Sequence, residues 1–257
     1  MRFYLWMPAL LVACEAGNPK VTETGNPKVT ETGNPQVDAR LAVTVMTTDS
    51  ELVSFEDDSG DLVVNSAWMV FGDLRFVSGE DDCEDPAEAD VTVDGPLVVD
   101  LIDMESVIDS FKLKSGEYCR IRLPMDRGAQ LPPGAPGALD DAAIAIEARR
   151  SDGTPVYLTS RSTEDLELKS DDDDPLTVDE DNRHLLVAFD LAVWFDELDL
   201  DSAGAEPNGD ILIDDDHNQE LLDDFEDNIE DAMELFGDDD EDGDLDDDED
   251  DDPLNDR

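Results

Sequence analysis

Basic residues are what this sequence lacks most. Its 16 Lys and Arg residues stand against 71 Asp and Glu, a formal net charge of −55, and none lies between Arg183 and Arg257. Such a chain repels nucleic acids and anionic lipid headgroups, which excludes unaided binding to a phosphate backbone. Cations are therefore the partners that the charge favours. The alternative is that the acidic surface serves only solubility or life at high salt.

Groups suited to catalysis are also scarce. There are two histidines, His184 at the start of an expected strand and His217 after three Asp residues. No Ser lies in a nucleophile elbow and no glycine-rich phosphate loop is present. Paired carboxylates cannot be singled out among so many. The sequence thus predicts no catalytic residues and a protein that is not an enzyme. An envelope hydrolase is the least favoured alternative hypothesis.

The sequence has no apolar run long enough to span a bilayer as a helix. Its first residues instead have the layout of a secretory signal: Arg2, then about ten mostly apolar residues, then small ones. Leu11-Val-Ala-Cys14 resembles the bacterial lipobox, which implies a lipid on Cys14. We expect a signal peptide over 1–13 and a protein exported and anchored to the bacterial cell envelope, at the outer membrane or the periplasmic face.

Cysteines number only three, and Cys14 is assigned to the lipid. Cys83 and Cys119 then form an even pair in an oxidising compartment, which predicts a disulfide between them. The alternative is two buried free thiols. The acidic residues on both sides of Cys83 argue against that alternative because they are too polar for a core.

Glycine and proline recur every eight residues after Cys14. The octapeptide GNPKVTET occurs twice, over 17–24 and 25–32, and a third copy is truncated. Such spacing prevents both a helix and a long strand. Residues 14–38 are therefore expected to be an extended tether, with an interaction motif as the alternative.

From residue 39 to 201 the chain consists of short apolar or alternating runs between turn residues. Long helices do not alternate with these runs, so we expect an antiparallel β-sandwich. One short helix is expected over 104–111. The expected strands are 41–46, 67–71, 74–77, 91–93, 96–100, 118–123, 143–148, 155–159, 166–168 and 185–194.

Three segments carry a resemblance to a known family: Val98–Ile102, Lys114–Leu123 and Asp152–Val156. Together they resemble an uncharacterised family of predicted bacterial lipoproteins with an immunoglobulin- or transthyretin-like sandwich. The resemblance covers about residues 40–201. It implies the fold and supplies no active site.

Residues 202–237 are expected to hold a short strand and an amphipathic helix. Apolar residues recur at spacings of three and four from Asn218 to Phe236, with Asn218 as the N-cap and Gly237 as the stop. Upstream, the segment 208–216 is expected to be a short strand. The alternative there is the second half of a degenerate EF-hand loop.

The acidic C-terminus, 238–257, contains a match to the EF-hand calcium loop. Gly243 falls at the sharp turn of this loop and Leu245 at its apolar eighth position. Calcium requires six to eight hard oxygen ligands, which alternate residues of a wrapped loop present inward. The predicted ligands are Asp238, Asp240, Asp242, Asp244, Asp246 and Glu249.

Gly237 lengthens the junction with the expected helix, and no second helix follows, because Asp250–Pro253 does not favour one. We therefore expect low-affinity Ca²⁺ binding. The alternative is a solvated acidic tail that attracts divalent ions diffusely.

The sequence as a whole predicts an envelope-anchored lipoprotein with a non-enzymatic, calcium-binding structural or adhesive role. The alternative is a β-sandwich module that binds a glycan or an envelope protein, with the acidic tail only for solubility. Trp68 and Trp194 are expected in the core, and sugar stacking is the lesser option for them.

Overall fold

The fold was analysed in a computed structural model of the chain. The structure describes residues 36–46, 53–57, 60–78, 91–102, 107–170, 176–180, 183–196, 198–237 and 254. All of them belong to one compact unit, Asn34–Arg257. None of the helices in these ranges is both long enough and apolar enough to cross a membrane.

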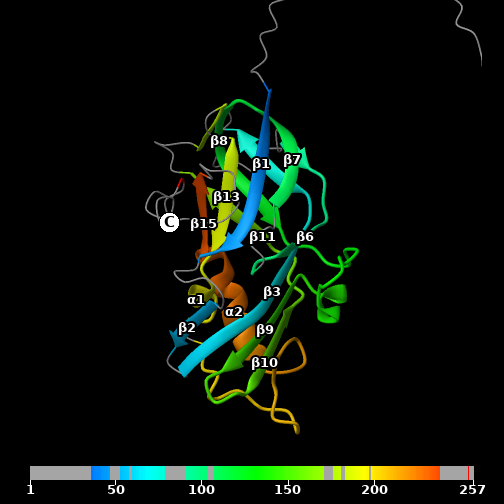
Figure 1. The fold of residues 1–257 in the computed structure, drawn as a ribbon, viewed down its shortest axis with the longest axis vertical. Helices are drawn as coiled ribbons and strands as arrows, with labels where there is room; N and C mark the ends of the chain where they lie inside the picture. The colour runs from blue at the N-terminus through cyan, green and yellow to red at the C-terminus, as the bar shows by residue number, and fades with distance from the viewer. Residues whose placement is uncertain are drawn as a thin grey trace, which may run out of the picture. The chain divides into compact units, whose positions relative to one another are not determined.

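The fold is mainly β, as the sequence predicts, and the described residues form three sheets and two α-helices. Figure 1 shows β15, β13, β1 and β7 side by side, and β3, β9 and β10 near α2. The first sheet has the order β15 (Met233–Gly237), β13 (His184–Phe189), β1 (Gln36–Val45) and β7 (Val107–Lys114). The second has the order β14 (Ile211–Ile213), β10 (Pro155–Ser160), β9 (Ile144–Arg150), β3 (Gly60–Phe71) and β2 (Val53–Asp57), with β6 (Leu97–Asp100) on β3. The third has the order β11 (Asp165–Lys169), β8 (Gly116–Pro124), β4 (Leu74–Ser78) and β5 (Val91–Val93), with β12 (Leu176–Val178) on β8.

One apolar cluster joins all three sheets and both helices, α1 (Leu191–Trp194) and α2 (Gln219–Asp231). Aromatic pairs join the sheets within this cluster. The ring centroids of Phe111 (β7) and Phe76 (β4) are 5.4 Å apart, and those of Phe189 (β13) and Phe71 (β3) are 6.5 Å apart. The first and third sheets therefore face each other as the layers of a sandwich. A short 3₁₀ helix, Gly137–Asp141, completes the described elements.

Two strand pairs differ from a purely antiparallel sandwich. β1 pairs parallel with β13, and β10 pairs parallel with β14. Every residue of β13 is buried, because β13 lies between β1 and β15 and is covered on both faces. Its continuous apolar run is typical of a strand buried in this way.

The expected strand over 185–194 is correct only as far as Phe189. The Asp190 carboxylate accepts a hydrogen bond of 2.9 Å from the Ala192 amide, which caps the single turn of α1. A capped turn has different backbone angles from a strand, so Leu191–Trp194 leaves the sheet.

The helix expected over 104–111 is wrong for its described part. Val107–Lys114 forms β7, which pairs antiparallel with β1. Leu113 is buried while Lys112 and Lys114 are exposed, the two-residue period of a strand. The spacing of three between Ile108 and Phe111 therefore gave a false helical signal.

The amphipathic helix exists but is shorter than predicted. α2 ends at Asp231, and Met233–Gly237 forms β15 on the edge of β13. The five residue pairs with β13 give Met233–Gly237 hydrogen bonds between strands and bury its apolar side chains. A further turn of α2 would not form these pairs. Upstream, the short strand expected within 208–216 is confirmed as β14.

Candidate functional site

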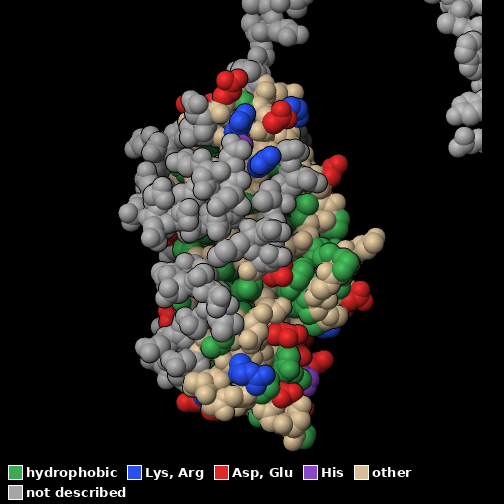
Figure 2. All heavy atoms as spheres, viewed as in Figure 1, with side chains coloured by type: hydrophobic (Ala, Val, Ile, Leu, Met, Phe, Trp, Pro, Cys, Tyr) green, Lys and Arg blue, Asp and Glu red, His purple; other side chains and the backbone are tan. Residues whose placement is uncertain are grey.

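The predicted calcium ligands, Asp238 to Glu249, lie outside the described residues, as do Cys14 and Cys83. The structure does describe the residues on either side of the acidic segment 238–253, namely Gly237 and Leu254. Every residue of this segment except Gly243, Leu245 and Pro253 is Asp or Glu. Asp and Glu side chains are also scattered over the described part of the face in Figure 2, where Lys and Arg are fewer.

The acidic segment is entered from a strand. Gly237, which directly precedes Asp238, pairs with Leu185 in the β15–β13 ladder. An EF-hand loop normally follows a helix, so the entering helix of that motif is missing here. Any calcium loop over 238–249 must therefore be an EF-hand-like loop on the end of a sheet.

The far end of the acidic segment returns to the same strand. The Leu254 amide donates a hydrogen bond of 2.6 Å to the carbonyl oxygen of Leu235, in the middle of β15. The half-buried Leu254 side chain packs against the main core. The described residues on either side of the acidic segment, Gly237 and Leu254, therefore both lie at β15.

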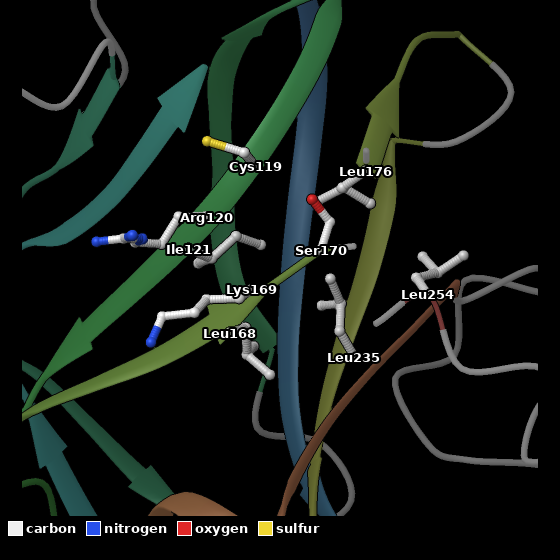
Figure 3. Close-up of a pocket in the computed structure, with 9 residues that line it drawn as sticks. All are labelled: Cys119, Arg120, Ile121, Leu168, Lys169, Ser170, Leu176, Leu235 and Leu254. Atoms are coloured by element: carbon white, nitrogen blue, oxygen red, sulfur yellow. The ribbon is translucent and has the colours of Figure 1, made fainter. Parts of the chain in front are cut away.

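Leu254 also lines a small cavity between the first and third sheets. Figure 3 shows Leu254 and Leu235 on one side of this cavity, while the Arg120 and Lys169 side chains extend the opposite way. Its volume is about 10 Å³, which admits one water molecule at most. The cavity is therefore a packing feature that receives Leu254, and it is far too small for an organic ligand.

A second polar constellation lies in the loop before α2. His217 Nδ1 is 2.8 Å from Asp214 Oδ1, and His217 Nε2 is 3.6 Å from Glu206 Oε1. The hydrogen bond to Asp214 raises the pKa of His217, and the nearby carboxylates add to this. Burial acts to raise the pKa of Asp214, but its hydrogen bonds from His217 and Asp216 outweigh burial and lower it. The contact between His217 and Asp214 closes the turn before α2.

Asn218 occupies the N-cap position of α2, as predicted, but its side chain does not cap the helix. It adopts a left-handed backbone conformation with φ of 50°. Its Oδ1 accepts from the Gly204 amide at 2.7 Å, and its Nδ2 donates to the Leu212 carbonyl at 2.6 Å. Asn218 therefore ties the 203–218 loop together.

Within the described ranges, no three His, Cys, Asp or Glu side chains come close enough together to hold a metal ion. Each ring nitrogen of His217 contacts one carboxylate, Nδ1 that of Asp214 and Nε2 that of Glu206. His184 opens β13, as predicted, and is 9% exposed.

Ser160 and Glu226 form a partly buried polar contact that the sequence did not reveal. Ser160 on β10 is fully buried, and its hydroxyl donates to Glu226 Oε1 of α2 at 2.5 Å. Burial raises the pKa of Glu226, and the carboxylates of Glu164, Asp215 and Asp223 raise it further, against the effect of the Ser160 bond. No periodic pattern pairs a serine with a glutamate 66 residues later, so only the tertiary structure exposes this contact.

Glu226→Gln is expected to stabilise the protein at neutral pH. A carboxyl whose pKa is raised by folding favours the folded state while protonated, and that contribution is lost as pH rises through the folded pKa. Glutamine keeps an acceptor for Ser160 and never ionises. Urea unfolding should therefore show a higher midpoint for Glu226→Gln at pH 7, and the difference should shrink as pH falls through the raised pKa of Glu226 and vanish below about 4.5, the ordinary pKa of Glu.

The matched control for this variant is Asp227→Asn, at an exposed position on the same helix. Asp227→Asn removes one exposed negative charge and leaves the half-buried carboxylate of Glu226 in place. An equal gain in midpoint from both variants would attribute the effect to overall charge and contradict the role assigned to Glu226.

The other described residues that the sequence singled out are one cysteine and two tryptophans. Cys119 is buried on β8 with its Sγ 3.5 Å from the carbonyl oxygen of Ser78, while its predicted partner lies outside the described residues, so the disulfide stays a prediction. Trp194 is fully buried in the core, which leaves no ring face for a sugar. Trp68 is half-buried beside a small separate cluster.

Leu254 is the residue that sequence reasoning overlooked. An apolar side chain directly after a highly acidic segment is the signal that could have identified it. It was missed because a single leucine has no periodicity.

Comparisons with known proteins add little. No family model matches the chain, and no characterised protein matches it by sequence. One solved structure, MbnP from Methylosinus trichosporium, is similar over 63% of this chain and 78% of its own, with 10% identity and a TM-score of 0.36. At that TM-score the similarity supports no conclusion about function.

Proposed function

We propose that this chain is an exported, lipid-anchored envelope protein that binds Ca²⁺ through residues 238–249 and has a structural or adhesive, non-enzymatic role. The observation that carries the proposal is the return of the chain to β15, where the Leu254 amide bonds to Leu235. It gives the acidic segment two fixed ends, which a free tail lacks.

Fixed ends favour ion binding for an entropic reason. Collecting six ligands from a free tail requires ordering the whole tail, at a cost in conformational entropy for each residue. Between Gly237 and Leu254 part of that cost is already met by folding. The segment also concentrates negative charge in sixteen residues, 238–253, so a divalent cation relieves their repulsion.

The entry from a strand favours low affinity. Without the entering helix, the loop lacks the frame that orients EF-hand ligands, and sites of this kind bind Ca²⁺ with Kd of about 10⁻⁴–10⁻³ M. That range suits an exported protein, because calcium is plentiful outside the cytoplasm. The proposed ligands remain Asp238, Asp240, Asp242, Asp244, Asp246 and Glu249.

The anchor completes the proposal. A lipid on Cys14 and the repeat tether would hold the sandwich clear of the membrane; the tether predicted over 14–38 can extend only to residue 35, because β1 begins at Gln36. A Cys83–Cys119 disulfide would suit the same oxidising compartment. Cys119 is buried next to the end of β4, only five residues before Cys83 in the chain, which is consistent with this pairing.

Calcium is expected to raise the melting temperature of the mature protein. For a Kd of about 1 mM, 10 mM Ca²⁺ stabilises the folded state by about 1.4 kcal/mol. In a domain of this size that corresponds to roughly 3–6 °C. The double variant Asp238→Ala/Glu249→Ala should lose the rise, as measured by circular dichroism with and without Ca²⁺.

A matched control removes the same two charges elsewhere. Asp227→Ala/Glu230→Ala takes one Asp and one Glu from exposed positions of α2 and should keep the full calcium response. Equal responses from the two double variants would mean diffuse ion attraction, and the proposed site would be abandoned.

A further inference from the structure

The strand β14, at the end of the second sheet, is only three residues long and is held from both sides. On one side it pairs parallel with β10. On the other side Ala205 forms an antiparallel bridge with Ile211, and the Glu206 amide donates a hydrogen bond of 2.8 Å to the carbonyl oxygen of Asp210. We call Ala205 and Glu206 the edge cover, because they lie along the outer edge of β14. Uncovered strand edges offer unpaired backbone groups to other chains.

One histidine joins the edge cover to the far end of β14. His217 Nδ1 is 2.8 Å from Oδ1 of Asp214, which directly follows β14. His217 Nε2 is 3.6 Å from Oε1 of Glu206, which precedes β14. The side chain of His217 is 42% exposed, so protons from solvent reach the imidazole freely.

The two contacts of His217 respond differently to its protonation. A neutral imidazole has one N–H and one lone pair, whereas the imidazolium donates from both nitrogens. Asp214 Oδ1 also accepts hydrogen bonds from the amides of Asp216 and His217, which hold it in place as an acceptor. In the neutral form the N–H is therefore assigned to Nδ1, and Nε2 turns a lone pair toward the carboxylate of Glu206. The contact with Asp214 survives deprotonation, and the contact with Glu206 does not.

The charges around His217 favour the imidazolium. The hydrogen bond to Asp214 is the main cause of the raised pKa of His217, and the carboxylates of Glu206 and Asp216 raise it further, against the effect of burial. The first turn of α2 carries another carboxylate, Glu220. Arg161 is a cation on the connection after β10, and it pairs with Asp215 at 2.9 Å.

We propose that His217 is a proton-operated clasp that fastens the edge cover over β14. While the imidazole is protonated, it links Glu206 to Asp214 across both ends of the strand. When the proton leaves, Glu206 is released and the edge cover loosens, while Asn218 still holds Gly204 and Leu212. The clasp is independent of calcium binding at the C-terminus.

The direction of the pH dependence follows from linkage. A histidine whose pKa is raised by folding stabilises the folded arrangement while it is protonated. This contribution is complete below 6.5, the ordinary pKa of His, and is lost as pH rises through the raised pKa of His217. The clasp is therefore closed in mildly acidic solution and open in alkaline solution.

Amide hydrogen exchange of the full mature chain, followed by mass spectrometry, tests the clasp. The unaltered chain and His217→Gln are compared at the same pH, so the intrinsic pH dependence of exchange cancels. At about pH 6, peptides covering 205–213 should exchange about threefold faster in His217→Gln, the effect of losing an exposed ion pair. At about pH 9 the two proteins should exchange these amides equally.

Two single-charge variants complete the test. Glu206→Gln removes the carboxylate that only the imidazolium binds, so at about pH 6 it should exchange as fast as His217→Gln. Glu220→Gln removes an exposed carboxylate from α2 and should keep the protection of the unaltered chain. Equal exchange over 205–213 in the unaltered chain and in both His217→Gln and Glu206→Gln at about pH 6 would overturn the proposal. A difference of the same size at about pH 9 would also overturn it, because the role of His217 would then not depend on its proton.

Discussion

Replacing Trp194 with alanine is expected to lower the free energy of unfolding by about 3–5 kcal/mol. Trp194 is completely buried and packs edge-on against Phe189 at 5.3 Å and Phe225 at 5.6 Å. These three rings join α1, β13 and α2, so their loss opens a cavity where the helices meet the first sheet. Urea unfolding monitored by circular dichroism measures the loss directly.

Trp194→Phe is the control that separates ring packing from polarity. The Trp194 Nε1 atom is buried and has no hydrogen-bond partner among the described residues, so phenylalanine keeps an aromatic ring and removes a donor that they leave unpaired. We expect its cost to be less than half that of alanine. A cost below about 1 kcal/mol for Trp194→Ala, outside the range for buried aromatics, would contradict the described core.

Leu254→Asp is expected to weaken calcium binding by about tenfold, a change of about 1.4 kcal/mol in binding free energy. Aspartate is poorly suited to the apolar cavity beside Leu235 and adds a charge next to a segment that already repels itself. The far end of the acidic segment is then released, and calcium must order it unaided. The shift of melting temperature over a calcium series gives the Kd of each variant.

A comparable change at a remote position provides the control. Leu131 is also half-buried and packs on a separate cluster with Trp68 and Leu139. Leu131→Asp should lower stability while leaving the calcium Kd unchanged. If Leu254→Asp has the Kd of the unaltered protein, the return of the chain to β15 does not matter for binding.

Most of the sandwich could be predicted from sequence because its strands follow local rules. β8 alternates buried Ile121 and Leu123 with partly exposed Arg120 and Arg122, which a two-residue period detects. β13 reads as a continuous apolar run because it is covered on both faces.

The errors arose where tertiary pairing decides the structure. Ile229, Met233 and Phe236 recur at helical spacing. Met233–Gly237 nevertheless forms a strand, because it pairs with the edge of β13. In the same way, pairing with β1 places the described part of the helix expected over 104–111 in β7. Periodicity over a few residues cannot show which strand edge is available.

The site was only partly predictable for a related reason. Local spacing predicts an EF-hand-like loop, but it does not predict that the Leu254 amide bonds to Leu235, nineteen positions earlier in the chain. The Ser160–Glu226 contact likewise depends on tertiary packing between β10 and α2, which no local motif encodes.

The central claim is that the acidic segment between Gly237 and Leu254 binds calcium at a specific site. Its most direct test is a calorimetric calcium titration of the full mature chain beside Asp238→Ala/Glu249→Ala. We expect one saturable site with Kd of about 10⁻⁴–10⁻³ M in the unaltered chain, and no such site in the double variant. Identical, non-saturating heats from both proteins would contradict the claim.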